Sequence, residues 1–353
     1  MTSSLPHLTL LLSTLLTVVA ALAASSSSPI PSKSYLVTGA NKGQGYALCK
    51  RILTEHPSSP QSTHVFLCSR DIQRGESAKE QLLNECNVDA NRVDVIQLDV
   101  TDQESVDAAS KEVQRILLSG DNAKKKLAGI VSNAGILWGY PLPELMDVCA
   151  TGVKRVLDAF VPLVEDDGRV VVVTSGLGPL LHSYSSEERQ KALTNTESSW
   201  DESLAPMIDD CLDAYAKSST IEERIAAFET IGFPGGPFAE SAPDFHMYGL
   251  AKMIGDAYML RVAHAHPSLR VTSVDPGLVY TDLILNMPKY AGLKKEETSA
   301  QSPEEGVDGA LQLLLDGEDV GKGLGVGSGK LYALNKEREL VFSDIDTMPQ
   351  KQQ

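Results

Sequence analysis

Tyr248 and Lys252 stand four positions apart, a spacing that places two side chains on one face of a helix. A free tyrosine has a pKa of about 10 and transfers protons poorly at neutral pH. An adjacent ammonium stabilises the phenolate, and lowering the pKa by about 3 units requires roughly 4 kcal/mol of such stabilisation. The pair is therefore a candidate acid–base group. Because the chain has ten tyrosines, this spacing also arises by chance, and its weight comes from its position one helix before an apolar segment.

Ser175 is a second candidate for chemistry, because with Thr174 it ends an apolar run. Ligands of parallel sheets bind at the carboxyl ends of the strands, where a serine can hydrogen-bond a substrate oxygen. The same residue is equally suited to cap a helix or form a turn.

A glycine-rich segment, Thr38–Gly45, lies between an apolar run and a helical pattern. Glycine permits a tight turn and lets a pyrophosphate approach the backbone, and the N-terminus of the following helix offers free N–H groups to the phosphates. The segment predicts a dinucleotide site. Its candidate binding residues are Gly39, Asn41, Lys42, Gly43 and Gly45.

The choice of dinucleotide depends on Arg70, which follows the second apolar run. At this point of a dinucleotide fold an acidic residue binds the ribose of NAD, whereas a basic residue accommodates the 2′-phosphate of NADP. Arg70 and Lys42 favour NADPH, while the adjacent Asp71 weakens the distinction. The alternative is that both basic residues are solvated surface charges.

The elements that must position these residues alternate between strands and helices. The strands are expected at 34–38, 64–68, 93–98, 127–131, 169–174, 269–274 and 330–333, and the main helices at 45–54, 75–85, 104–118, 142–164 and 250–265. This order predicts an α/β fold: one doubly wound Rossmann domain over residues 33–345 with a parallel sheet. Residues of about 180–245 contain no strand-like run, and they are interpreted as a helical insertion before Tyr248.

Composition excludes several classes of protein. The net charge of −16 over 353 residues disfavours binding to nucleic acids and to anionic membrane surfaces. Five cysteines without a C-x-x-C pair predict neither a disulfide framework nor a zinc site, and no metal is expected.

Residues 1–32 differ from the rest of the chain. No Asp, Glu, Lys or Arg precedes Lys33, and the apolar stretch 8–24 ends in small residues and a serine run. This pattern predicts a signal or organelle-targeting leader and a location in the secretory pathway or an organelle. The alternative is an uncleaved membrane anchor, although the stretch is shorter than the usual span.

Together these motifs resemble the short-chain dehydrogenase/reductase family over residues 34–335. The matching elements, in chain order, are Thr38-Gly39-x-x-x-Gly43-x-Gly45, Leu98-Asp99-Val100, Asn133-Ala134-Gly135, Ser175, Tyr248 with Lys252, and Pro276-Gly277-x-x-x-Thr281-Asp282. Each element is unspecific alone, but six in the right order are specific together.

The resemblance implies a role for each matching residue. Asp99 and Asn133 would line the adenosine site, and the segment with Pro276, Gly277 and Thr281 would border the nicotinamide. Tyr248 would be the general acid, Ser175 would orient the carbonyl, and Lys252 would tune Tyr248 and hold the ribose.

The form of the glycine loop and the long insertion resemble the carbonyl reductases within this family, which implies a monomer acting on a small carbonyl or alcohol substrate.

One position departs from the family pattern. Three residues before Gly152 the family places an asparagine that completes a proton relay, and this chain has Cys149. A thiol hydrogen-bonds weakly, which puts the relay in doubt. The leading function is NADPH-dependent reduction of an aldehyde or ketone. The alternatives are an alcohol or retinol-type dehydrogenase, which shares every motif, and a cofactor-binding sensor without turnover. The sequence does not identify the substrate or the physiological direction.

Overall fold

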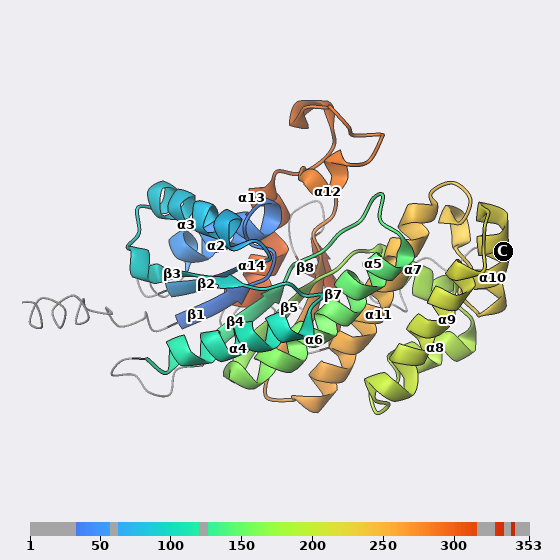
Figure 1. Cartoon of the computed structure of the whole chain (residues 1–353), viewed down its shortest axis with the longest axis horizontal. Helices are drawn as coiled ribbons and strands as arrows, with labels where there is room; N and C mark the ends of the chain where they lie inside the picture. Colours follow the sequence, from blue (N-terminus) through green and yellow to red (C-terminus); the bar gives the residue numbers. More distant parts are fainter. Residues whose placement is uncertain (1–32, 57–62, 120–125, 316–328, 335–339, 343–353) are drawn as a thin grey trace, which may run out of the picture.

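The computed structural model of the chain describes residues 33–56, 63–119, 126–315, 329–334 and 340–342 (Figure 1). The leader or anchor predicted for residues 1–32 lies outside them and stays a prediction. Among the described residues, no helix combines the length and apolar character that crossing a membrane requires.

The core of the molecule is one twisted sheet with the strand order β3-β2-β1-β4-β5-β6-β7-β8. Its strands are β1 Lys33–Val37, β2 Thr63–Ser69, β3 Val93–Gln97, β4 Leu127–Ser132, β5 Val164–Val173, β6 Arg270–Asp275, β7 Lys330–Leu334 and β8 Leu340–Phe342. The first seven are parallel, and β8 pairs antiparallel with β7. The predicted doubly wound parallel sheet is thus confirmed, with an additional antiparallel edge strand that the sequence did not indicate.

Both faces of the sheet are buried, because the strands alternate their side chains between two apolar cores. Val37 and Val65 belong to one core, whereas the adjacent Leu36 and Phe66 belong to the other. The first core is closed by α2 Gly43–Glu55, α3 Ile72–Cys86 and α14 Asp308–Leu315, and the second by α4 Gln103–Leu117, α6 Gly152–Phe160 and α11 Pro243–Ala265 (Figure 1). The chain passes from β3 on one side of β1 to β4 on the other, so the strand order reverses between β1 and β4. Folds of this kind bind their ligands at the carboxyl ends of the two strands at this point.

The segment predicted as one long helix over 142–164 is interrupted. It consists of α5 Leu142–Met146, a π-helical turn at Asp147–Thr151, α6 and a short 3₁₀ turn. At the π turn α11 comes very close: a Cβ on Gly255 would lie 2.6 Å from the carbonyl oxygen of Cys149. Such turns are rare and are often found at functional sites.

The insertion before Tyr248 is helical, as expected. It contains α7 Leu177–Tyr184, α8 Glu187–Thr194, α9 Ala205–Ala216 and α10 Ile221–Thr230, which gather at one end of the molecule (Figure 1). Leu193, Cys211 and Phe228 from these helices share a third apolar core with Met253 of α11. α7 was not predicted, because its residues are mostly small or apolar without a clear period. The monomer expected from the insertion stays a prediction.

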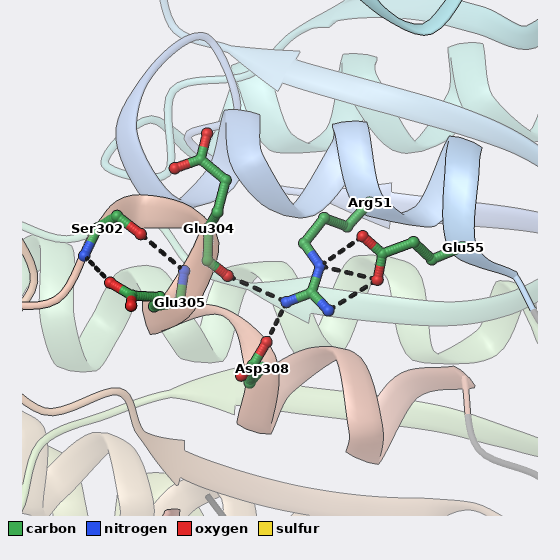
Figure 2. A network of polar contacts seen from close by, with 6 residues as sticks. All are labelled: Arg51, Glu55, Ser302, Glu304, Glu305 and Asp308. Atoms are coloured by element: carbon green, nitrogen blue, oxygen red, sulfur yellow. Dashed lines mark hydrogen bonds and ion pairs between the residues drawn. The ribbon is translucent and has the colours of Figure 1, made fainter.

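The chain after β6 returns to the glycine-loop side of the sheet through α12 Asp282–Leu285, α13 Pro303–Gly306 and α14. Arg51 of α2 holds this return: its guanidinium donates to Glu55, to the carbonyl of Glu304 and to Asp308 (Figure 2). Ser302 and Glu305 cap α13 reciprocally. The segment that follows β6 is thereby anchored against the C-terminal half of α2.

Candidate active site

The loop between β1 and α2 requires its glycines. Gly39 and Gly43 have φ angles of +63° and +56°, which side chains other than glycine rarely adopt. A Cβ on Gly45 would lie 2.5 Å from the carbonyl oxygen of Gly39, so α2 can approach the loop only with glycine there. Lys42 precedes the helix without capping it through its side chain. The first N–H groups of α2 are therefore available to an anion.

Asn133 and Thr38 tie the end of β4 to this loop. The Asn133 amide donates to the Thr38 carbonyl at 2.9 Å, and the Thr38 hydroxyl accepts from the backbone N–H groups of Asn133 and Ala134 at 2.9 and 3.0 Å. The structure thus brings the predicted residue Asn133 to the glycine loop, where its side chain supports the backbone. Thr38 is fully buried, and its part in this support was not predicted.

The two charged residues that follow β2, Arg70 and Asp71, differ in what their side chains contact. Asp71 caps α3 by accepting from the backbone N–H groups of Gln73 and Arg74, at 2.9 and 3.1 Å. Its carboxylate is therefore engaged with the helix, which removes the ambiguity of the sequence at this point. The Arg70 side chain is exposed, and its backbone carbonyl accepts from the Gln97 amide at 3.5 Å.

Three more of the predicted cofactor residues lie close by. Lys42 forms an exposed ion pair with Asp282, across from the glycine loop. Asp99 follows β3 and accepts from the backbone N–H and the hydroxyl of Thr101, at 3.0 and 2.7 Å. Asn41 is half-buried in the loop. Asp99 and Lys42 thus have partners within the chain, and a cofactor phosphate would compete with Asp282 for Lys42.

The segment after β6 faces the glycine loop. Thr281 is its point of contact: a Cβ on Gly43 would lie 3.3 Å from the Thr281 methyl. Gly277 has a φ of +70°, and the Pro276 carbonyl accepts from the Gln301 amide at 3.0 Å. The structure therefore places the segment that carries Pro276, Gly277 and Thr281 against the glycine loop.

Tyr248 and Lys252 lie on α11 and are both buried, 6% and 5% exposed. The Lys252 ammonium lies 5.6 Å from the centre of the Tyr248 ring and donates to the carbonyl of Val173, the last residue of β5, at 2.8 Å. It also lies 3.7 Å from where a Cβ on Gly135 would stand. The pair therefore reaches the carboxyl ends of β4 and β5.

The pKa of Tyr248 shifts in the direction opposite to the one expected from the sequence. Burial raises the pKa of Tyr248 well above its usual value, and electrostatic interactions with Cys149, Asp275 and Asp256 raise it further. Tyr248 is consequently protonated at neutral pH, and in this environment it is a weaker acid than a free tyrosine.

Ser175 lies in the turn between β5 and α7. Its hydroxyl accepts from the backbone N–H of Leu177 at 3.3 Å, so it takes part in the helix start that the sequence left open. No hydrogen bond joins Ser175 to Tyr248 in the described part of the chain. The two residues share the carboxyl end of the sheet because Lys252 binds Val173, two positions before Ser175.

Two carboxyl groups beside Lys252 were missed by the sequence analysis. Asp256 accepts from the Thr174 hydroxyl at 2.7 Å, and its burial raises its pKa to about 7. Asp275 accepts from the backbone N–H of Gly277 at 2.9 Å, and burial raises its pKa as well. Asp256 stands four positions after Lys252, and Asp275 directly precedes Pro276. Both positions could have been noticed from these spacings.

Asp256, His182 and Ser273 also border a cavity of about 640 Å³ on the side of α11 that faces α8 and β7. This cavity includes neither Tyr248 nor the glycine loop. It is therefore separate from the crevice to which the motifs point.

Cys149 lies in the π turn and is fully buried. Its thiol donates to the carbonyl of Ile136 at 3.5 Å, a weak bond to a backbone group rather than to Lys252. The described residues contain no group of three or more His, Cys, Asp or Glu side chains arranged to hold a metal ion.

The chain has the strand order and the glycine loop of α/β proteins of the dinucleotide-binding type, together with the buried pair Tyr248 and Lys252. The family model for short chain dehydrogenase matches residues 33–186. The (+)-neomenthol dehydrogenase of Arabidopsis thaliana is 27% identical over 303 residues, which cover 79% of this chain and 90% of that protein.

Solved structures agree with this fold. Salutaridine reductase from Papaver somniferum has a TM-score of 0.63 at 24% identity, covering 85% of this chain and 99% of that one. An NADPH-bound carbonyl reductase from chicken fatty liver has a TM-score of 0.54 at 18% identity, covering 88% and 99%. The chain is thus similar to short chain dehydrogenases, by the family model over residues 33–186 and by relatives over most of its length. It is an oxidoreductase that acts on carbonyl or alcohol groups.

Proposed function

We propose that this protein reduces a small aldehyde or ketone with NADPH as the hydride donor. The observation that carries the proposal is the buried Tyr248–Lys252 pair, which lies at the carboxyl end of the sheet, the edge that also carries the glycine loop. Relatives named as a dehydrogenase and as reductases, one of them solved with NADPH bound, support the same reaction class.

The residues present fit a nicotinamide dinucleotide. A Cβ at Gly45 would collide with the backbone of the loop, and the start of α2 leaves N–H groups for a pyrophosphate. Arg70 is exposed at the end of β2 with its guanidinium available for a 2′-phosphate. When bound, such a cofactor supplies a hydride to the carbonyl carbon.

The chain itself would supply the proton and the orientation. Tyr248 donates its hydroxyl proton to the carbonyl oxygen as that oxygen gains negative charge. Lys252, fixed by its bond to Val173, places a positive charge beside the phenolate that remains. Ser175 would orient the carbonyl by exchanging its contact with the Leu177 N–H for one with the substrate.

Oxidation of an alcohol by the same residues would require Tyr248 as a base. The same residues serve either direction, and the relatives named as reductases are the support for proposing reduction.

The test is NADPH oxidation over a panel of aldehydes and ketones, with wild type and Tyr248→Phe. We expect turnover to fall by about 10²–10⁴ in the variant, the usual contribution of a positioned proton donor, while NADPH binding is retained. Tyr215→Phe is the matched control, because Tyr215 lies on α9 outside the crevice, and it should behave like wild type. Wild-type turnover in Tyr248→Phe would remove this residue from the mechanism. NADPH binding without turnover on any carbonyl would favour the sensor function.

A further inference from the structure

Lys252 lies between two carboxyl groups at the buried end of the site. Both carboxylates, those of Asp256 and Asp275, interact electrostatically with its ammonium. Neither Lys252 nor Asp275 forms an ion pair within 4.0 Å in the described part of the chain. With both carboxyls ionised, this cluster of three side chains carries a net negative charge.

The backbone fixes the position of Asp275. Val173 and Val274 are partners in the β5–β6 ladder, so the carbonyl that binds Lys252 and the residue that precedes Asp275 lie side by side. The Asp275 carboxylate accepts from the Gly277 N–H at 2.9 Å. It is so close to the opposite turn that a Cβ on Gly176 would lie 2.9 Å from its second oxygen. Asp275 is thus held between the turn that carries Ser175 and the turn after β6.

This place is also where positive charge would form in the proposed reaction. A nicotinamide ring becomes cationic as its hydride leaves. In the proposed reaction the ring would lie close to Tyr248, because the carbon that would take up the hydride carries the oxygen that Tyr248 would protonate. Tyr248 itself is within the field of Asp275.

Asp275 is the better source of negative charge of the two carboxyls. Asp256 has a pKa of about 7 and is partly protonated at neutral pH. Burial also raises the pKa of Asp275, but the backbone N–H bonds that it accepts and the Lys252 ammonium stabilise its ionised form.

Resting on the proposed function, we propose that the Asp275 carboxylate stabilises the positive charge developing on the nicotinamide ring and so favours carbonyl reduction over alcohol oxidation. Asp275 would act on the ring through its charge, without direct contact, since its hydrogen bonds among the described residues are to backbone N–H groups. The consequence is a preference in binding: the site holds NADP⁺ more tightly, relative to NADPH, than it would without this charge.

The competing explanation is structural. Asp275 accepts from the N–H two residues later, as aspartates and asparagines do in turns, and so it could serve only to shape the segment after β6. Asp275→Asn separates the two roles, because asparagine keeps the accepting oxygen and the volume but removes the charge. Asp275→Ala removes both.

The test is the dissociation constant of NADP⁺ and of NADPH, measured separately by calorimetry without substrate. For Asp275→Asn we expect NADP⁺ binding to weaken by about tenfold, the scale of one charge acting through the protein, with NADPH within about twofold of wild type. The control is Asp282→Asn, which removes a carboxylate paired with Lys42 on the same segment. Because both oxidation states carry the same phosphates, this variant should leave the ratio of the two constants unchanged.

The electrostatic role would be overturned if Asp275→Asn weakened the binding of NADP⁺ and NADPH equally. It would also be overturned if the ratio of the two dissociation constants changed only in Asp275→Ala. Asp275 would then serve only to shape the turn after β6. If the wild-type protein binds neither form, the proposed function itself fails.

Discussion

At the glycine-loop end of the crevice the backbone offers the binding groups, whereas at the Tyr248 end buried side chains determine the chemistry. The first end depends on positive φ angles, on the close approach of Gly45 and on the open N-terminus of α2, and its charged groups Lys42 and Arg70 are exposed. The second end buries Lys252 near two carboxyl groups.

This difference predicts how added side-chain volume and changes of charge should affect each end of the site. A backbone cradle is sensitive to added side-chain volume, and its fold tolerates changes of exposed charge, which water screens, so that such changes act on ligand binding instead. A buried cluster tolerates little change of charge, because the interior screens weakly and desolvation is costly. The variants below test this contrast, beginning with the largest expected effect.

Asp256→Asn should change how stability depends on pH. The pKa of Asp256 in the folded protein is about 7, above the ordinary value of 3.8. Between about pH 4 and 7 the folded state therefore binds a proton that the unfolded state does not, and stability falls as pH rises through this window. The loss reaches about 4 kcal/mol at most. Asparagine cannot ionise, so thermal melts of the variant should vary less with pH over this range than those of wild type.

The control for this experiment is Asp107→Asn, an exposed carboxylate on α4 that accepts only from Gln103. It should retain the wild-type pH dependence. The same dependence in Asp256→Asn would mean that Asp256 is ionised without penalty. The two ends of the crevice would then not differ in the way described above.

Arg70→Ala tests the exposed end. We expect NADPH to bind more weakly by about 1.5–3 kcal/mol, the scale of a hydrogen bond to a charged group, with NADH much less affected. Arg74→Ala is a matched control, because Arg74 is also exposed and pairs with Asp71 at 3.6 Å. Equal losses for the two cofactors in Arg70→Ala, measured by titration of each, would exclude a 2′-phosphate role.

The fold could largely be predicted because its signals are local. Each parallel strand is an apolar run bounded by turn residues, and the helices between strands follow periods of three to four. Elements without such signals were missed: α12 and α13 have four residues each, and β8 has three. The first turns of α11 were also missed, because Pro243 and the residues after it lack a clear apolar period.

The glycine loop and the Tyr–Lys pair were found for the same reason, since each motif is contiguous or one helical turn long. Asp275 and Asp256 were missed because their importance arises from the β5–β6 pairing and from the packing of α11, which no local pattern contains. The electrostatic effect of Lys252 on Tyr248 was misjudged because the cost of burial depends on the whole core around α11. Asp71 was ambiguous until its bonds to α3 were known.

The smallest expected effect concerns Cys149, which stands where the resembled family has its relay asparagine. The structure supports a packing role, because the thiol is buried and donates to the Ile136 carbonyl. In Cys149→Asn one amide N–H can take over that bond, so we expect a stability loss of about 1 kcal/mol for the remaining unpaired groups and an unchanged kcat. Cys211→Asn is the matched control. The thiol of this buried cysteine of α9 has no hydrogen-bond acceptor of this kind among the described residues, so its variant should melt at a lower temperature than Cys149→Asn. A kcat that rises in Cys149→Asn without a change in NADPH affinity would contradict packing. It would show that a missing amide limits proton delivery at the buried end of the crevice, so that this end would depend on a side-chain relay as well as on its charges.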